Sequence, residues 1–198
     1  MAHGEIFLKK NEDKRLRQGH LWVFSNEIDT TRSPLEQFAA GDLVQVKASD
    51  GKVMGTAYIN PQSLICARLL SRKGNLKCGV NFFKERLTTA LVLREKLFDK
   101  PYYRLVYGES DGLPGLVIDR FGSVFSVQIT TAGIDLRKDS LITALHEIFS
   151  PTAIVLKNDN SQRQLEGLDL ESLVVHGELP DNLIIEENGA KFKIDILG

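Results

Sequence analysis

Cysteine, tryptophan and methionine are scarce in this sequence, and no apolar segment reaches the length of a membrane span. The 198 residues include two cysteines, one tryptophan and two methionines. Cys66 and Cys78 are too few for a disulfide framework and lack the histidine spacing of a zinc site. Residues 1–20 carry too many charges for a secretory signal. We therefore expect a cytoplasmic protein with no membrane contact and no metal site.

Net charge is also small, at −1, but the two parts of the chain differ. Residues 1–80 hold 12 lysines and arginines against 8 acidic residues, while residues 81–198 hold 13 against 18. A basic first part suits a polyanionic partner, because phosphate contacts rely on lysine and arginine. Mixed charge is also what ordinary protein surfaces carry, and the asymmetry alone favours that simpler interpretation.

The first part of the chain predicts short strands at close intervals. Asn11 to Gln18 predict a short polar helix that ends at Gly19. Asp50-Gly51 predicts the turn of a two-residue hairpin. Strands are predicted over residues 4–9, 42–49, 52–59 and 63–70. This spacing, with few helices, is typical of a small β-barrel or sandwich.

After a polar linker the apolar period changes from two residues to 3.6. One amphipathic helix is predicted between Asn81 and Phe98, and another from about Asp135 to Phe149. Strands are predicted over residues 103–107, 116–119, 124–130, 153–157 and 173–176, and a hairpin over 183–187 and 190–196 with an Asn188-Gly189 turn. This pattern indicates a second, α/β or α+β, domain. Gly198, just beyond an amphipathic strand, is interpreted as a domain junction.

The sequence offers no strong catalytic site. The turn from Gly112 to Gly115 precedes a predicted strand instead of a helix, so we interpret it as a turn and not as a phosphate loop. The acidic residues Glu109, Asp111 and Asp119 fit either a paired-carboxylate acid/base site or a set of turns. The successive turn dipeptides Asp111-Gly112 and Pro114-Gly115 favour a structural role for these carboxylates. Neither cysteine has an obvious activating base. The histidines, which would need to cluster to bind a metal, are scattered at His3, His20, His146 and His176.

Trp22 and Phe24 lie close in sequence to a basic segment, Lys9 to Arg17. Aromatic and basic residues together can stack a base and hold its phosphate. Their strand spacing also fits simple core packing, which we favour for Trp22. The segment therefore leaves both alternatives open.

Several motifs in the same order resemble the bacterial 23S rRNA 5-methylcytosine methyltransferases. Gly19–Ile28, Gly41–Pro61 and Ser63–Ser71 resemble the N-terminal PUA domain of that family. Arg104–Gly122 resembles the motif that opens its central domain, with Ser110 where glycine is expected. Arg163 with Glu166-Gly167-Leu168 resembles its next landmark. The resemblance covers nearly the whole chain.

The resemblance implies a fold class of α+β, with an N-terminal PUA-like β-barrel followed by a small α/β domain and a β-hairpin, and with the Rossmann-like methyltransferase domain absent. The expected limits are 1–72 for the barrel, 73–79 for a linker, 80–181 for the central domain and 182–198 for the hairpin. The full-length parent would use S-adenosylmethionine (SAM) to methylate carbon 5 of a cytosine in 23S ribosomal RNA. No cofactor, catalytic residue or activity is expected in this chain alone.

This chain would then bind and orient RNA, and its basic residues become hypotheses for phosphate contact. These residues are Lys9, Lys10, Lys14, Arg15 and Arg17, with His20, Arg68, Arg72 and Lys73 as weaker candidates. The central domain could serve substrate contact, domain positioning or contact in a homodimer. A stand-alone PUA-type RNA-binding adaptor and an enzyme that uses the acidic turn stay open as alternatives.

Overall fold

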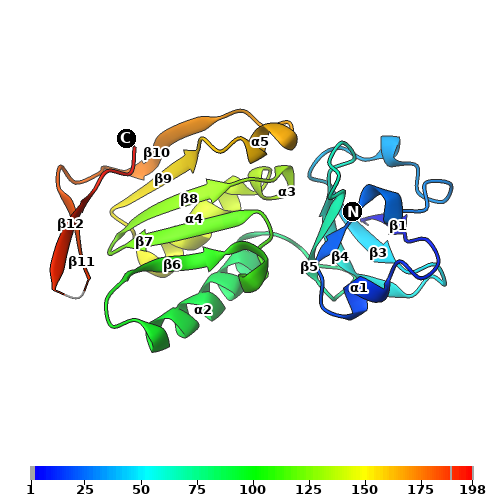
Figure 1. Cartoon of the computed structure of the whole chain (residues 1–198), viewed down its shortest axis with the longest axis horizontal. Helices are drawn as coiled ribbons and strands as arrows, with labels where there is room; N and C mark the ends of the chain where they lie inside the picture. Colours follow the sequence, from blue (N-terminus) through cyan, green and yellow to red (C-terminus); the bar gives the residue numbers. More distant parts are fainter. Residues whose placement is uncertain (1–2, 188, 198) are drawn as a thin grey trace.

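The computed structural model describes residues 3–187 and 189–197. Figure 1 shows two sheets beside each other, with a two-stranded hairpin at the end far from the N-terminal sheet. Asn188 of the predicted hairpin turn and the predicted junction at Gly198 lie outside the described residues. Within the described part, no helix is both long and apolar enough to cross a membrane.

The first sheet has five strands around one apolar core. Its strands are β1 (Gly4–Phe7), β2 (Trp22–Val23), β3 (Leu43–Lys47), β4 (Val53–Ile59) and β5 (Ala67–Ser71). They lie in the order β1-β3-β4-β5-β2, with β1 parallel to β3 and the other neighbours antiparallel. The core includes Ile6, Val44, Val46 and Leu69, and in β3 the buried valines alternate with less buried residues as the sequence predicts.

The predicted β-barrel is wrong, because this sheet is open. Its edge strands are β1 and β2. β2 has only two residues and pairs with β5 alone, so it cannot close the sheet onto β1. Among the described residues, only an isolated bridge between Leu8 and Ile28 links the two edges. An open sheet leaves β2 free to face the second half of the molecule.

Local differences in the first half have identifiable causes. The predicted helix from Asn11 shortens to α1 (Lys14–Arg17), because Asn11 has a left-handed φ of 71°. The strand predicted from Ser63 begins later, since the Ser63 amide donates to the Asn60 carbonyl in a turn. Two short 3-10 helices complete this half, η1 (Ser25–Glu27) and η2 (Leu35–Gln37).

The second sheet has two long helices on one face. Its strands are β6 (Tyr102–Tyr107), β7 (Leu116–Phe121), β8 (Val124–Ile129), β9 (Ala153–Asn158) and β10 (Glu171–Gly177). They lie in the order β10-β9-β8-β7-β6, and only β8 and β9 are parallel. The helices α2 (Val80–Leu97) and α4 (Lys138–Phe149) cover the same face (Figure 1). Phe83 and Leu87 of α2 and Leu141 and Leu145 of α4 are fully buried there.

Shorter helices connect these strands, and the end of the chain covers part of the opposite face. The helix predicted from Asp135 is interrupted at Arg137, which separates α3 (Ala132–Asp135) from α4. The other short elements are η3 (Gly108–Asp111) and α5 (Gln162–Leu165). The hairpin pairs β11 (Leu183–Glu187) with β12 (Ala190–Ile194). Ile196 beyond it packs against strands β8 and β9.

Tyr58 joins the two halves. It belongs to β4 of the first sheet, yet it lies in the core of the second half and is fully buried. Its hydroxyl donates to the Pro114 carbonyl at 3.0 Å and contacts the Thr131 hydroxyl at 3.1 Å. Burial raises the pKa of this phenol well above its usual range. A Cβ on Gly133 would lie 2.0 Å from the Tyr58 ring, so the fit requires glycine there.

Candidate nucleic-acid interface

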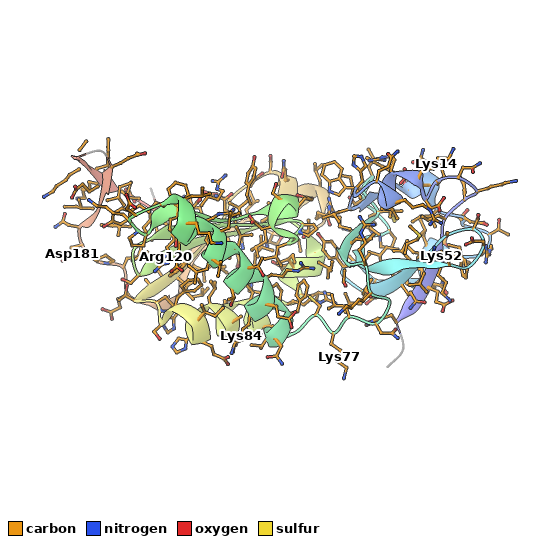
Figure 2. All side chains as sticks on the ribbon, turned by 90° about the horizontal axis from the view of Figure 1, so that it is seen from below. Lys14, Lys52, Lys77, Lys84, Arg120 and Asp181 are labelled. Carbon is orange, nitrogen blue, oxygen red and sulfur yellow. The ribbon has the colours of Figure 1, made fainter. Side chains whose placement is uncertain are left out.

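Exposed basic side chains surround α1. Lys10 and Lys14 are exposed, and Figure 2 shows Lys14 at the outer surface of the first half. Arg72, just after β5, donates to a carbonyl oxygen of α1 at 2.6 Å and to that of His20 at 3.1 Å. Lys73 and His20 are exposed beside it. The fold thus brings residues that are far apart in sequence to one surface.

Three other predicted phosphate contacts already have protein partners. Arg15 pairs with Glu27 at 3.1 Å, and its guanidinium lies 4.9 Å from the centre of the Phe24 ring. Lys9 donates to the carbonyl oxygen of Asn26, and Arg17 donates to the carboxylate of Asp13. These side chains are partly exposed, so their role toward RNA stays a prediction.

Arg68 does not belong to this surface, and its prediction as a phosphate contact needs correction. Its side chain is only 11% exposed and pairs with Glu166 at 2.9 Å. Asn60 donates to the same carboxylate at 2.9 Å. Glu166 is itself buried. A buried cation with a buried carboxylate partner holds the two sheets together and is not free to meet a phosphate.

The acidic turn contains three separate contacts and no carboxylate pair. Asp111 accepts two hydrogen bonds from Arg94, at 2.8 and 2.7 Å, and one from the Tyr107 amide. Glu109 accepts a 2.6 Å hydrogen bond from the Trp22 indole. The remaining carboxylate, Asp119, pairs with Arg104. These contacts agree with the structural interpretation of the turn.

The glycine turn nearby does not fit an adenosyl cofactor. Gly112 and Gly115 have φ values of +67° and +76°, and the chain then enters strand β7. A Cβ on Gly115 would lie 2.2 Å from the Thr131 hydroxyl oxygen, so this glycine serves close packing. The turn opens no helix, and its amides form no helix N-terminus for a phosphate or carboxylate. No step of SAM chemistry is therefore assigned to it.

The cysteines and histidines show no sign of catalysis. Burial raises the pKa of the Cys66 thiol to about 11 and that of the Cys78 thiol to about 12, which opposes thiolate formation. The rings of His146 and His176 lie 5.0 Å apart, a contact that their sequence positions did not indicate. In the described ranges, no three histidine, cysteine or acidic side chains are grouped to hold a metal ion.

Two clefts run between the halves of the molecule and meet at Trp22, Glu109 and Ser110. The first, about 960 Å³, includes the basic side chains His20, Arg72 and Arg86 and is here called the basic cleft. The second, about 720 Å³, is here called the tyrosine cleft, and it is lined in part by Leu64, Tyr107, Gln128, Thr130 and Leu165. Neither cleft could be predicted from the sequence, because their walls come from segments far apart in the chain.

Comparison with known proteins gives one domain match and a group of relatives. Residues 6–72 match the model of a PUA-like domain. The chain is 38% identical over 196 residues to ribosomal RNA large subunit methyltransferase I of Aliivibrio fischeri (strain MJ11), covering 97% of this chain and 49% of that protein. It is 37% identical over 199 residues to the same-named protein of Vibrio vulnificus (strain YJ016), covering 98% and 49%. The chain spans about half the length of these curated relatives.

Two solved structures share the fold. A candidate SAM-dependent methyltransferase from Streptococcus mutans has a TM-score of 0.76 and 19% identity, covering 96% of this chain and 48% of its own. A candidate methyltransferase in complex with SAH has the same TM-score and identity, and the match covers 98% of this chain and 47% of that one. The expected fold class is wrong: methyltransferase structures match nearly this whole chain, so a PUA-like barrel with the Rossmann-like methyltransferase domain absent is not supported.

These matches and the geometry agree on a coarse description. The first sheet, with its exposed cations around α1, lies in the segment that matches the PUA-like model. The curated relatives match both sheets and the hairpin. This chain therefore contains a PUA-like domain and is similar, over nearly its whole length, to ribosomal RNA large subunit methyltransferases.

Proposed function

We propose that this chain is the N-terminal, RNA-binding and substrate-orienting region of a SAM-dependent methyltransferase that modifies carbon 5 of a cytosine in 23S ribosomal RNA. The PUA-like match and the names of the curated relatives support an RNA-methyltransferase role. SAM as methyl donor is supported by the SAH complex of a structural neighbour. No residue of this chain is assigned a catalytic role.

The observation that carries the proposal is the unpaired positive charge around α1. Lys10, Lys14, Arg72 and Lys73 have no carboxylate partner among the described residues. An exposed cation without a partner is free to neutralise a phosphate and to release its counterion. Side chains from α1 and from the end of β5 would then hold the backbone of one RNA segment.

The domain limits remain part of the proposal. We place the RNA-binding domain at 1–72, a linker at 73–79, the central domain at 80–181 and the hairpin at 182–198. A cytoplasmic location follows from ribosomal RNA as substrate. For the central domain, the buried contact between Arg68 and Glu166 favours a role in domain positioning over contact in a homodimer.

Salt-dependent RNA binding tests the proposal. We expect the Lys10→Ala/Lys14→Ala double variant to weaken binding of a large-subunit rRNA fragment. The slope of its plot of log affinity against log salt concentration should become less negative by about 1.4 to 1.8, because two phosphate contacts are lost. Filter binding across a salt series measures both quantities.

The matched control is the Lys191→Ala/Lys193→Ala variant of β12, which removes the same charge from exposed positions. These residues belong to the hairpin, at the opposite end of the molecule from α1 (Figure 1). The proposal is wrong if both double variants change the slope equally or if neither changes it.

A stand-alone RNA-binding adaptor is the second candidate function. The glycine turn from Gly112 to Gly115, which does not fit an adenosyl cofactor, is the observation that favours it. Transfer of labelled methyl groups from SAM to rRNA by the natural protein distinguishes the two functions. Methylated cytosine would support the methyltransferase, while RNA binding without transfer would support the adaptor.

A further inference from the structure

The tyrosine cleft offers hydrogen bonds and apolar surface but no unpaired cation. Its three charged residues are Arg68, Glu109 and Glu166. Arg68 and Glu166 pair with each other, and Glu109 accepts from the Trp22 indole. The indole is neutral, so Glu109 keeps its negative charge, and an anionic group such as a phosphate would gain no unpaired cation inside the cleft. An uncharged polar group is the better match.

Free amide groups line the same cleft. Gln62, Gln128 and Gln162 line it, and within the described residues their side-chain amides make no hydrogen bond to the protein; only the backbone amides of Gln62 and Gln162 donate, to Asn60 and Asn160. Each amide carries both donors and an acceptor. Paired donors and acceptors of this kind match the polar edges of an unpaired nucleobase.

Exposed apolar side chains form the walls. Tyr107, at the end of β6, is 57% exposed, while Leu64 and Leu165 are 72% and 77% exposed. The Arg104 guanidinium lies 5.4 Å from the centre of the Tyr107 ring. A partly exposed aromatic ring beside a guanidinium is a surface on which a base can stack.

The neighbouring basic cleft supplies the complementary charge. Arg72 and Arg86 line it, and both donate to backbone carbonyl oxygens. Neither has a carboxylate partner in the described part of the chain. Because the two clefts meet at Trp22, Glu109 and Ser110, one strand could place a phosphate beside the arginines of the first and a base in the second.

We propose that the tyrosine cleft holds an unpaired nucleobase of single-stranded RNA, stacked on Tyr107, while the basic cleft holds the adjoining phosphate. This inference rests on the proposed RNA-binding function and gives it a substrate class, an unpaired strand instead of a duplex. About 720 Å³ lies within the range of small-ligand sites and has room for a base.

Trp22 makes the proposal directly measurable. It is the only tryptophan in the chain, and it lines both clefts. Tryptophan emission therefore reports on this junction alone. We expect a 12-nucleotide single-stranded RNA to change the Trp22 emission on binding, and the blunt duplex of the same sequence to leave it nearly unchanged.

Variants of Tyr107 test the stacking step. Tyr107→Ala should weaken single-strand binding by about 5- to 150-fold, because one base loses its stacking partner. Duplex affinity should not change. Tyr107→Phe keeps the ring and should bind normally. The Tyr107 amide still donates to Asp111 in both variants, so the turn is retained.

Phe192→Ala is the matched control, because it removes a similarly exposed aromatic ring, 48% exposed, from the hairpin. Equal losses in Tyr107→Ala and Phe192→Ala, or no loss in either, would overturn the inference. If Tyr107→Ala has no effect while the lysine variants still flatten the salt dependence, only the nucleobase site is wrong. If no RNA binds the intact protein, the proposed function is wrong as well.

Discussion

Replacing Glu166 with alanine should destabilise the protein strongly, because it leaves a buried cation without a partner. The Glu166 side chain is 4% exposed and that of Arg68 is 11% exposed. The carboxylate accepts from Arg68 and Asn60, both at 2.9 Å, and more weakly from the Ala132 amide at 3.4 Å. Removing one partner of a buried ion pair costs about 3–5 kcal/mol. We expect a loss of unfolding free energy within that range.

Urea unfolding, followed by Trp22 fluorescence and by circular dichroism, measures this loss. The matched control is Glu147→Ala, which breaks the exposed pair between Lys84 and Glu147 at 2.6 Å. Both side chains of that pair are at least 40% exposed, so its removal should cost no more than about 1 kcal/mol. The reasoning is refuted if Glu166→Ala also loses less than about 1 kcal/mol.

Two other perturbations test buried positions. Gly133→Ala should lose about 1–3 kcal/mol, because its Cβ would overlap the Tyr58 ring. Gly79→Ala, whose Cβ meets nothing within 4 Å, should lose less, about 0.5 kcal/mol, because Gly79 is the N-cap of α2 and alanine caps a helix less well than glycine; thermal unfolding compares them. Raising the pH should also destabilise the protein. Burial raises the pKa of Cys66 to about 11 and of Cys78 to about 12 from 9.0, so unfolding free energy should fall from about pH 9 upward. Alkylation at pH 8.5 should label neither thiol until the protein unfolds; fast labelling of the native protein would contradict this.

Elements with a clear apolar period could be predicted from the sequence. The helix predicted between Asn81 and Phe98 is observed as Val80–Leu97, and the strands at 42–49 and 52–59 are observed as β3 and β4. In α2 and β3 the local apolar period decides which face is buried, whereas β4 is buried on both faces. Such elements depend little on distant parts of the chain.

Contacts between distant segments could not be predicted. Trp22 and Glu109 lie 87 positions apart, and Arg68 and Glu166 lie 98 apart. The sequence favoured Trp22 as core and Arg68 as a weak RNA contact, but Trp22 is half-buried at the clefts and Arg68 is buried. The Glu166-Gly167-Leu168 motif is recognisable in the sequence, but nothing near it indicates that Arg68 is the partner of Glu166. The predicted barrel is wrong for the same reason, because closure of a sheet depends on whether strands far apart in the sequence pair with each other.

The fit of Tyr58 against Gly133 limits how the two halves can be exchanged between relatives. A chimera that joins the first sheet of one protein to the second sheet of another must bring a large ring and a residue without a side chain to the same spot. If Gly133 is replaced by a larger residue, the Tyr58 ring has no room. If Tyr58 is replaced by a smaller residue, a cavity is left above the glycine. Compatibility at this contact, like that at the Arg68–Glu166 pair, therefore limits which recombined proteins can assemble the two clefts.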